Sequence, residues 1–243
     1  LLEWYDDNKR DLPWRRAKGT EHHAYAVWVS EIMLQQTRVA TVIDYFERWM
    51  DKWPSVESLS KASLDEVNEM WAGLGYYRRA RMLHQGAKDI MEKHGGKLPS
   101  TVAGLKTIAG IGDYTAGAVG SIAFGVQTPV VDGNVVRVAS RFRAFGGDVK
   151  ASSSMQGFWR VAESIVPKER PGDFNQALME LGATVCHVTS PLCDSCPVKA
   201  HCAAFAESVQ DQEGKPVTRF PAKKKKADPR NDTVAVCIVT DPG

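Results

Sequence analysis

The sequence of 243 residues lacks several features that would define its surroundings. No apolar run reaches the roughly 20 residues that a membrane-spanning helix needs, so we expect no membrane as a partner. Charge of one sign is not in excess either, since the formal net charge is only +2, which is compatible with nucleic acid but does not argue for it. No targeting segment is visible, but the chain opens within the helix-like stretch Leu1 to Tyr5, so this absence excludes nothing.

Cysteines are few and strand patterns are nearly missing. Four of the five cysteines lie between positions 186 and 202, whereas a disulfide framework would spread them through the fold, so a metal centre in a reducing compartment is indicated. A strand pattern occurs only from Thr233 to Thr240, which we interpret as the first strand of a further domain. The basic run from Lys223 to Lys226 is typical of a solvated linker.

Helical spacing dominates the rest of the chain. Apolar residues recur every three or four positions from Val39 to Met50, and a new helix is predicted to start at Ser63, with acidic residues in its first turn. Further helices are predicted over residues 78–94, 101–107, 113–124, 133–144, 153–166 and 173–186. The predicted fold class is therefore all-α, with a linker from about residue 208 to residue 232.

The four clustered cysteines have the spacing C-x6-C-x2-C-x5-C, at Cys186, Cys193, Cys196 and Cys202. Four thiolates so close in sequence can surround one centre without long loops, and the tight Cys193–Cys196 pair occurs in both zinc and iron–sulfur sites. The residues alone leave zinc and a [4Fe–4S] cluster equally open, with unligated thiols as a third possibility. Cys237 lies far from the others, and we expect it to be a core residue.

Two carboxylates are candidates for acid–base chemistry. Glu31 lies among bulky apolar neighbours, three residues after Trp28, and desolvation there would raise its pKa as a general acid requires. An ordinary surface glutamate is the alternative. Asp132 begins a predicted helix in the segment V-D-G-N, where a plain N-cap is the alternative to a catalytic role.

Glycines between Thr107 and Gly117 predict a helix, a tight turn and a second helix. Gly110 and Gly112 let the backbone approach a ligand, and the second helix offers free N–H groups, which together would suit a phosphate. Taken alone, the pattern is also typical of a plain connection between two helices, so other evidence is needed to favour the phosphate site. Tyr76 and Tyr77 are followed closely by arginines, which favours contact with nucleic acid over simple packing at a helix start.

Taken together, the motifs of residues 1–207 resemble those of MutY-type adenine DNA glycosylases, in the endonuclease III superfamily. The shared motifs, in chain order, are L-P-W-R, W-V-S-E-x-M-L-Q-Q-T, G-L-G-Y-Y, the glycine turn, V-D-G-N, F-N-Q-A and the four cysteines. The resemblance implies a helix–hairpin–helix glycosylase fold, with a helical barrel over 23–135, a cluster domain made of 1–22 and 136–207, and a linker over 208–243 toward a C-terminal domain. It also implies a [4Fe–4S] cluster on the four cysteines and a monomeric chain.

The resemblance further implies a base-excision-repair enzyme acting on double-stranded DNA that holds adenine opposite 8-oxoguanine or guanine. Hydrolysis of an N-glycosidic bond needs a proton for the base and negative charge beside the oxocarbenium-like sugar. Glu31 would protonate adenine at N7, Asp132 would stabilise the sugar, and Asn134 would orient these groups. Tyr114 stands where strand-cutting relatives have lysine, so base release alone is expected. The enzyme would act inside the cell with DNA, in the nucleus, mitochondria or nucleoid.

The remaining site residues follow from the same resemblance. An enzyme that extrudes a base must fill the gap in the stack, which is the role implied for Gln36 and Tyr76. The residues implied to line the adenine pocket are Arg10, Leu12, Trp14, Arg15, Trp28 and Gln176. A core role is the alternative for both tryptophans, and Gln176 could instead bond within its helix.

The chain departs from the family pattern in two places. Ala109 replaces the usual proline before Gly110, which should loosen the turn by up to about 1 kcal/mol. Residues 17–23 form an insertion-like stretch. Two other functions stay open: a bifunctional glycosylase/lyase acting on oxidised pyrimidines, against which Tyr114 argues, and a non-catalytic DNA-binding module, against which the two carboxylates argue.

Overall fold

A computed structural model describes residues 1–211, 216–222 and 237 of the chain, and these residues are arranged in helices and loops. They form thirteen α-helices, three short 3₁₀ helices and no strand, which confirms the all-α prediction. No helix in this part of the chain has both the length and the apolar character to cross a membrane. The basic run from Lys223 to Lys226 lies outside the described residues, and so does the predicted strand apart from Cys237. Cys237 is exposed, so the expectation that it is a core residue is wrong.

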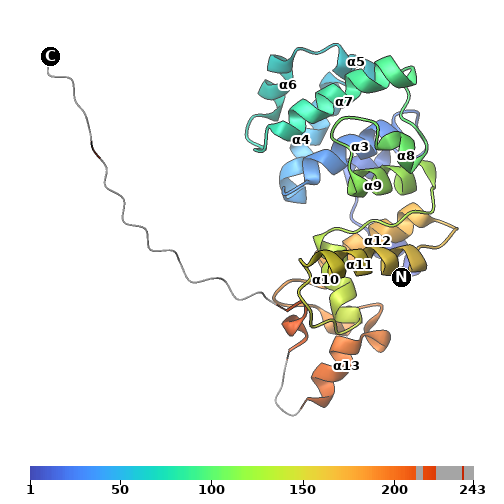
Figure 1. Ribbon diagram of the computed structural model, residues 1–243, viewed down its shortest axis with the longest axis vertical. Helices are drawn as coiled ribbons and strands as arrows, with labels where there is room; N and C mark the ends of the chain where they lie inside the picture. The colour runs from blue at the N-terminus through green and yellow to red at the C-terminus, as the bar shows by residue number, and fades with distance from the viewer. Residues whose placement is uncertain (212–215, 223–236, 238–243) are drawn as a thin grey trace.

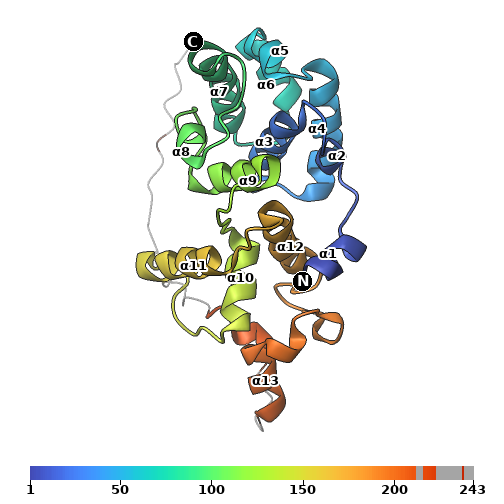
Figure 2. The same cartoon turned by 90° about the vertical axis from the view of Figure 1, so that its right-hand side faces the viewer.

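The larger lobe holds the helices that follow α1, up to α9, in the upper part of Figures 1 and 2. These helices are α2 (Pro13–Arg16), α3 (His23–Leu34), α4 (Val39–Lys52), α5 (Val56–Ser60), α6 (Leu64–Trp71), α7 (Arg78–His94), α8 (Val102–Leu105) and α9 (Asp113–Phe124). Helix α3 is apolar on all sides and buried along most of its length, as expected for a helix surrounded by others. The polar side chains of Ser30 and Glu31 on α3 are therefore buried as well.

Local signals explain where several of these helices begin and end. Ser63 caps α6 as predicted, because its hydroxyl accepts from the Glu66 N–H at 3.2 Å while the Glu66 carboxylate accepts from the Ser63 N–H at 2.9 Å. On α4 the buried residues Val42, Phe46 and Trp49 fall on one face. The apolar side chains that recur with the predicted helical spacing thus form the face of α4 that packs in the core of the larger lobe.

The second lobe contains the first helix and the C-terminal helices, in the lower part of Figure 2. These are α1 (Leu2–Asn8), α10 (Gly133–Phe142), α11 (Ser152–Ile165), α12 (Pro171–Thr184), η1 (Cys193–Ser195), η2 (Lys199–His201), α13 (Ala203–Gln210) and η3 (Val217–Arg219). Its apolar residues form three small clusters instead of one large core. Val217 and Phe220 pack with Ala204, so part of the stretch expected to be a linker belongs to one of these clusters.

Segment 1–22 divides between the lobes. Leu12 and Trp14 pack in the larger core, where the Trp14 and Phe46 ring centroids are 5.4 Å apart. Trp4 of α1 instead packs in the second lobe, against the cluster that contains Leu181. The grouping of all of 1–22 with the cluster domain therefore differs from the packing, because α2 supplies apolar side chains to the larger core.

The lobes join where α9 and α10 meet α12. The Asn175 side chain on α12 donates to Ser121 Oγ and to the Thr128 carbonyl, both at 2.9 Å, and so ties the connection between α9 and α10 to α12. Gly182 permits the close contact of α12 with α10, because a Cβ there would lie 2.6 Å from the Asn134 Cβ. This junction determines where Asp132 enters α10.

Candidate active site

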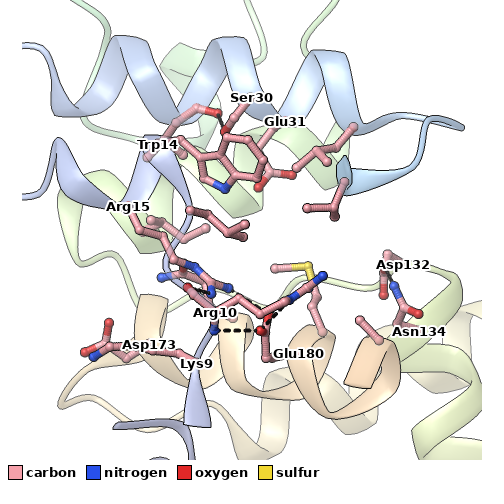
Figure 3. Close-up of a pocket in the computed structure, with 18 of the residues that line it drawn as sticks. Lys9, Arg10, Trp14, Arg15, Ser30, Glu31, Asp132, Asn134, Asp173 and Glu180 are labelled. Carbon is pink, nitrogen blue, oxygen red and sulfur yellow. Dashed lines mark hydrogen bonds and ion pairs between the residues drawn. The ribbon is translucent and has the colours of Figure 1, made fainter. Parts of the chain in front are cut away.

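A cavity of about 300 Å³ lies between the two lobes. Figure 3 shows Glu31 reaching into it from α3, with Glu180 and Arg10 on the opposite side and Asp132 and Asn134 at one end. The predicted site residues that line this cavity are Arg10, Leu12, Trp14, Arg15, Glu31, Tyr114, Asp132, Asn134 and Gln176. Segments far apart in sequence thus bring most of the predicted pocket together, at a size suited to a small ligand.

Glu31 is a buried carboxyl of the cavity wall whose pKa is raised. It is only 6% exposed, so it is not a surface glutamate. Burial raises its pKa to about 7, and the charge of Asp132 adds to this, while a hydrogen bond from Tyr114 and the charge of Arg15 act in the opposite direction. A carboxyl with this pKa holds a proton about half of the time at neutral pH, as a general acid must.

Tyr114 on α9 contacts this carboxyl directly. Its hydroxyl donates to Glu31 Oε2 at 2.6 Å and lies 3.7 Å from the Met179 sulfur. Burial and the neighbouring Glu31 raise the pKa of Tyr114 well above its usual value, so the phenol stays protonated. The position therefore supplies a neutral hydrogen-bond donor to the carboxyl and no nucleophilic amine.

Asp132 caps α10 and also faces the cavity. Its Oδ1 accepts from the Val135 N–H, and its Oδ2 accepts from Asn134 Nδ2, both at 2.7 Å. Asn134 is held in turn by Arg137, whose Nη2 donates to Asn134 Oδ1 at 2.8 Å and whose Nε donates to the Cys186 carbonyl at 2.8 Å. Asp132 can therefore cap α10 and present a carboxylate to the cavity at the same time, because the capping hydrogen bond fixes the orientation of that carboxylate.

The opposite wall contains Glu180, which the sequence reading missed. Its carboxylate accepts from Arg10 Nε at 2.7 Å, Arg10 Nη2 at 3.0 Å and Arg15 Nη2 at 2.9 Å. Burial acts to raise its pKa, but the two arginines prevail and hold it at about 2. Arg15 also donates to Gln176 Oε1 at 3.1 Å. The spacing of Gln176 and Glu180, four residues apart on one helix, was the available signal for this wall.

One residue predicted for the adenine pocket and the two predicted wedge residues lie away from the cavity. Trp28 is fully buried in the larger core instead of lining the pocket, since α3 is surrounded by apolar neighbours. Gln36 and Tyr76 lie on exposed turns with φ of +57° and +49°, and the Tyr76 side chain is 62% exposed. Their exposure suits contact with a macromolecule.

The glycine turn forms between α8 and α9. Gly110 has φ of +81°, a conformation that favours glycine, and a Cβ there would lie 2.7 Å from the Met82 Cβ. Gly112 caps α9 without a side-chain hydrogen bond, so the first N–H groups of this helix have no side-chain cap. The Ala109 N–H, which a proline would lack, donates to Asp89 Oδ2 at 3.0 Å and thereby offsets the loosening expected from that replacement.

The four predicted ligand cysteines line a second, smaller hollow. Arg141, Lys199 and apolar side chains share this hollow, and it contains no carboxylate or imidazole. Arg141 donates to Cys186 Sγ at 3.3 Å and to the His187 carbonyl at 2.6 Å. Across residues 1–211, 216–222 and 237, no three His, Cys, Asp or Glu side chains are arranged to hold a metal ion. The donors gathered here are therefore sulfur atoms beside cations, without the geometry of a single-ion site.

Comparisons with known proteins agree with this arrangement. The family described as HhH-GPD superfamily base excision DNA repair protein matches residues 29–164. The adenine DNA glycosylase of Arabidopsis thaliana is 50% identical over 98% of this chain and 41% of its own length. The adenine DNA glycosylase of Homo sapiens is 46% identical over 100% of this chain and 52% of its own length. The chain thus spans about half the length of these relatives.

Solved structures show the same fold. A thermostable thymine-DNA glycosylase matches with a TM-score of 0.74 at 28% identity, covering 85% of this chain and 93% of its own. An endonuclease III in a non-covalent DNA complex matches with a TM-score of 0.66 at 24% identity, covering 77% of this chain and 86% of its own, a likeness of fold alone. The family predicted from the motifs is confirmed.

Proposed function

The chain belongs to the HhH-GPD superfamily of base excision DNA repair proteins, and on that premise we propose that it is a monofunctional adenine DNA glycosylase. Its substrate is double-stranded DNA with adenine opposite 8-oxoguanine or guanine, which implies an intracellular protein that acts where DNA is. The observation that carries the proposal is Glu31, a buried carboxyl with a pKa of about 7, held by Tyr114 in a cavity that also presents Asp132. The name of the relatives supports adenine as the base.

The two carboxylates divide the chemistry of bond breaking. Because Tyr114 occupies Glu31 Oε2, the proton for the base is assigned to Oε1, which delivers it to N7 of adenine. The bond between C1′ and the base then breaks, and its electron pair leaves with the protonated base. Asp132, oriented by Asn134, stabilises the positive charge that develops at C1′. Water adds to C1′ and returns a proton to Glu31.

Side chains of the cavity hold the extruded base. Gln176 and Arg15 offer amide and guanidinium groups to its edge, and Arg15 is itself anchored by Glu180. Trp14 and Leu12, nearly buried, supply an apolar surface for its faces. A base that is read by polar groups at its edge and by apolar contact at its faces is the usual arrangement for an extruded nucleotide.

The DNA backbone and the gap left by the base engage other parts of the larger lobe. The turn from Gly110 to Gly112 presents the free N-terminus of α9 to phosphate, which binds without regard to sequence. Gln36 and Tyr76, on exposed turns, fill the space next to the oxidised guanine. These contacts require only one copy of the chain, so a monomer is proposed.

The hollow with four cysteines is the proposed site of a [4Fe–4S] cluster. Cys186, Cys193, Cys196 and Cys202 would be the ligands, because such clusters take four thiolates and the hollow offers sulfur donors only. The cluster would serve structure by ordering the loop between Cys186 and Cys202, without a part in base removal. Arg141 and Lys199 would neutralise part of its negative charge.

The experiment that tests the proposal is single-turnover release of adenine from duplexes with adenine opposite 8-oxoguanine. Duplexes with a thymine–guanine mismatch or an oxidised pyrimidine serve as controls. The expected result is an abasic strand that stays intact until alkali is added. Release of thymine or of the oxidised pyrimidine in its place would contradict the proposal.

The lysines of the cavity provide a further control. Lys9 and Lys18 line it, each with a carboxylate partner at 3.8 Å and 3.1 Å respectively, so neither amine is expected to attack C1′. Borohydride added during the reaction should therefore trap no adduct between protein and DNA. A trapped adduct would mean that the chain is a glycosylase/lyase.

A further inference from the structure

The exposed turns that contain Gln36 and Tyr76 meet at one buried cation. Both residues have a positive φ, a conformation that residues with a side chain adopt only when the surroundings enforce it. Gln36 follows α3 and Tyr76 precedes α7, so the two turns come from segments 40 residues apart. Something other than local sequence must therefore set the distance between them.

Arg79, in the first turn of α7, contacts both turns at once and is only 9% exposed. Its Nη1 donates to the carbonyl oxygens of Ile32 at 3.0 Å, Met33 at 2.8 Å and Gln35 at 2.5 Å. Its Nη2 donates to Thr37 Oγ1 at 3.1 Å and to the carbonyl oxygens of Leu74 and Gly75 at 3.2 Å each. One nitrogen thus holds the turn of Gln36, and the other connects it to the turn of Tyr76.

The guanidinium of Arg79 also supports the aromatic side chain itself. It lies 5.6 Å from the Tyr76 ring centroid and 5.3 Å from that of Trp71, within the range of cation–π contacts. Among the described residues no carboxylate forms an ion pair with Arg79, so backbone carbonyls, one hydroxyl and the two rings stabilise its charge. A planar group with fixed donors holds its acceptors at set distances, which a flexible lysine cannot do.

We propose that Arg79 is a positioning residue that holds Gln36 and Tyr76 at the separation needed for both to enter the duplex as one wedge. The inference rests on the proposed function, in which these two side chains fill the space next to 8-oxoguanine. Because Arg79 is buried, it acts through the two turns and not by contact with DNA. Its loss should therefore impair extrusion of the base, while the chemistry at Glu31 is unchanged once the base is in the cavity.

The test compares Arg79→Lys, which keeps the charge and loses the planar donors, in the wild-type and Tyr76→Ala backgrounds. Arg160→Lys is the matched control, because Arg160 is exposed on α11 in the other lobe. At saturating protein, Arg79→Lys should slow adenine release about tenfold in the wild-type background and less than about twofold in the Tyr76→Ala background, since coupled residues are not additive. Thermal melting of each variant shows whether it is folded.

A second readout does not depend on base release. A 2-aminopurine placed beside 8-oxoguanine becomes brighter when the wedge unstacks it, and Arg79→Lys should reduce this increase at saturating protein. Equal losses of rate in both backgrounds, or an unchanged fluorescence increase, would overturn the role of Arg79. If Arg79→Lys does not fold, Thr37→Val removes one acceptor at nearly constant shape and is judged by the same two measurements. Failure of the wild-type chain to release adenine, with the fluorescence increase intact, would refute the proposed function alone.

Discussion

The two walls of the cavity present buried carboxylates with opposite properties. Glu31 on α3 and Glu180 on α12 are 6% and 1% exposed, yet their pKa values are about 7 and about 2. Glu180 accepts hydrogen bonds from two arginines, whereas the hydrogen bond that Glu31 accepts comes from the neutral Tyr114. Burial therefore does not decide the protonation state by itself; the partners do. One wall is suited to giving a proton, and the other anchors the segment of Arg10 and Arg15.

The largest expected effect is on catalysis when the acid is removed. Glu31→Gln should slow adenine release by about 100- to 10,000-fold, the usual contribution of a general acid, while DNA affinity stays nearly constant. Single-turnover rates and a binding titration measure the two quantities. Stability should not fall, because an amide removes the cost of an ionised buried carboxyl, and this gain should grow between about pH 4.5 and about pH 7. Release at the normal rate would mean that another group is the acid.

The same substitution on the other wall should affect stability. Glu180→Gln leaves Arg10 and Arg15 without a counter-charge and should lower the free energy of unfolding by about 3 kcal/mol, at the lower end for a broken buried ion pair because Arg10 is partly exposed. Chemical denaturation measures this loss. The stability that Glu180 confers is present above its unfolded pKa of about 4.5 and is lost as the pH falls toward about 2, so wild type and variant should converge in acid. A constant difference down to that pH would contradict the assigned ion pairs.

Removing the hydroxyl that holds the acid should have a smaller effect. Tyr114→Phe deletes a hydrogen bond that lowers the pKa of Glu31, so the pKa of this carboxyl should rise further. The fall of the rate with increasing pH should then move to higher pH, and the rate at neutral pH should drop by about two- to tenfold through lost orientation. A profile that keeps its position, or moves to lower pH, would contradict the role assigned to Tyr114.

The smallest effect is expected at a third buried carboxylate, Asp89. Burial acts to raise its pKa, but Lys93 at 2.9 Å and the Ala109 N–H at 3.0 Å hold it below its usual value. Asp89→Ala should weaken binding to undamaged duplex by about 0.5 kcal/mol, or roughly twofold, because the turn before Gly110 loses its anchor. Asp89→Asn, which still offers an acceptor to Ala109, is the matched control and should weaken binding less. Equal weakening by both variants would show that the ion pair with Lys93 matters and the turn does not.

The sequence predicted what depends on neighbours along the chain. The cap at Ser63, the period of α4 and the turn at Gly110 each need only a few adjacent residues, and the structure contains all three. The apolar surroundings of Glu31 likewise indicated a buried acid, because α3 is apolar around its whole circumference. The all-α class followed from such local signals summed along the chain.

Contacts between distant segments could not be read in this way. Glu180 meets Arg10 across 170 positions, so its role depends on how the lobes join. Trp28 was assigned to the pocket, but a helix that is apolar on every side does not indicate which face lines a cavity. The arginines after Tyr77 suggested DNA contact as a group, yet Arg79 points inward to carbonyl groups while Arg78 is exposed. Periodicity cannot separate these two neighbours, because both follow the same motif.

The most direct test of the account is the pH dependence of single-turnover adenine release by the wild-type chain, from about pH 5.5 to about pH 9. The central claim is that burial raises the pKa of Glu31 to near neutrality, because no cation among the described residues donates a hydrogen bond to this carboxyl as Arg10 and Arg15 do to Glu180. The account predicts a rate that is constant at low pH and falls tenfold per pH unit above an apparent pKa of about 7. A rate that is flat across the whole range would contradict it, and so would a rate that already falls tenfold per pH unit at the lowest pH measured, as for an ordinary glutamate with a pKa of about 4.3.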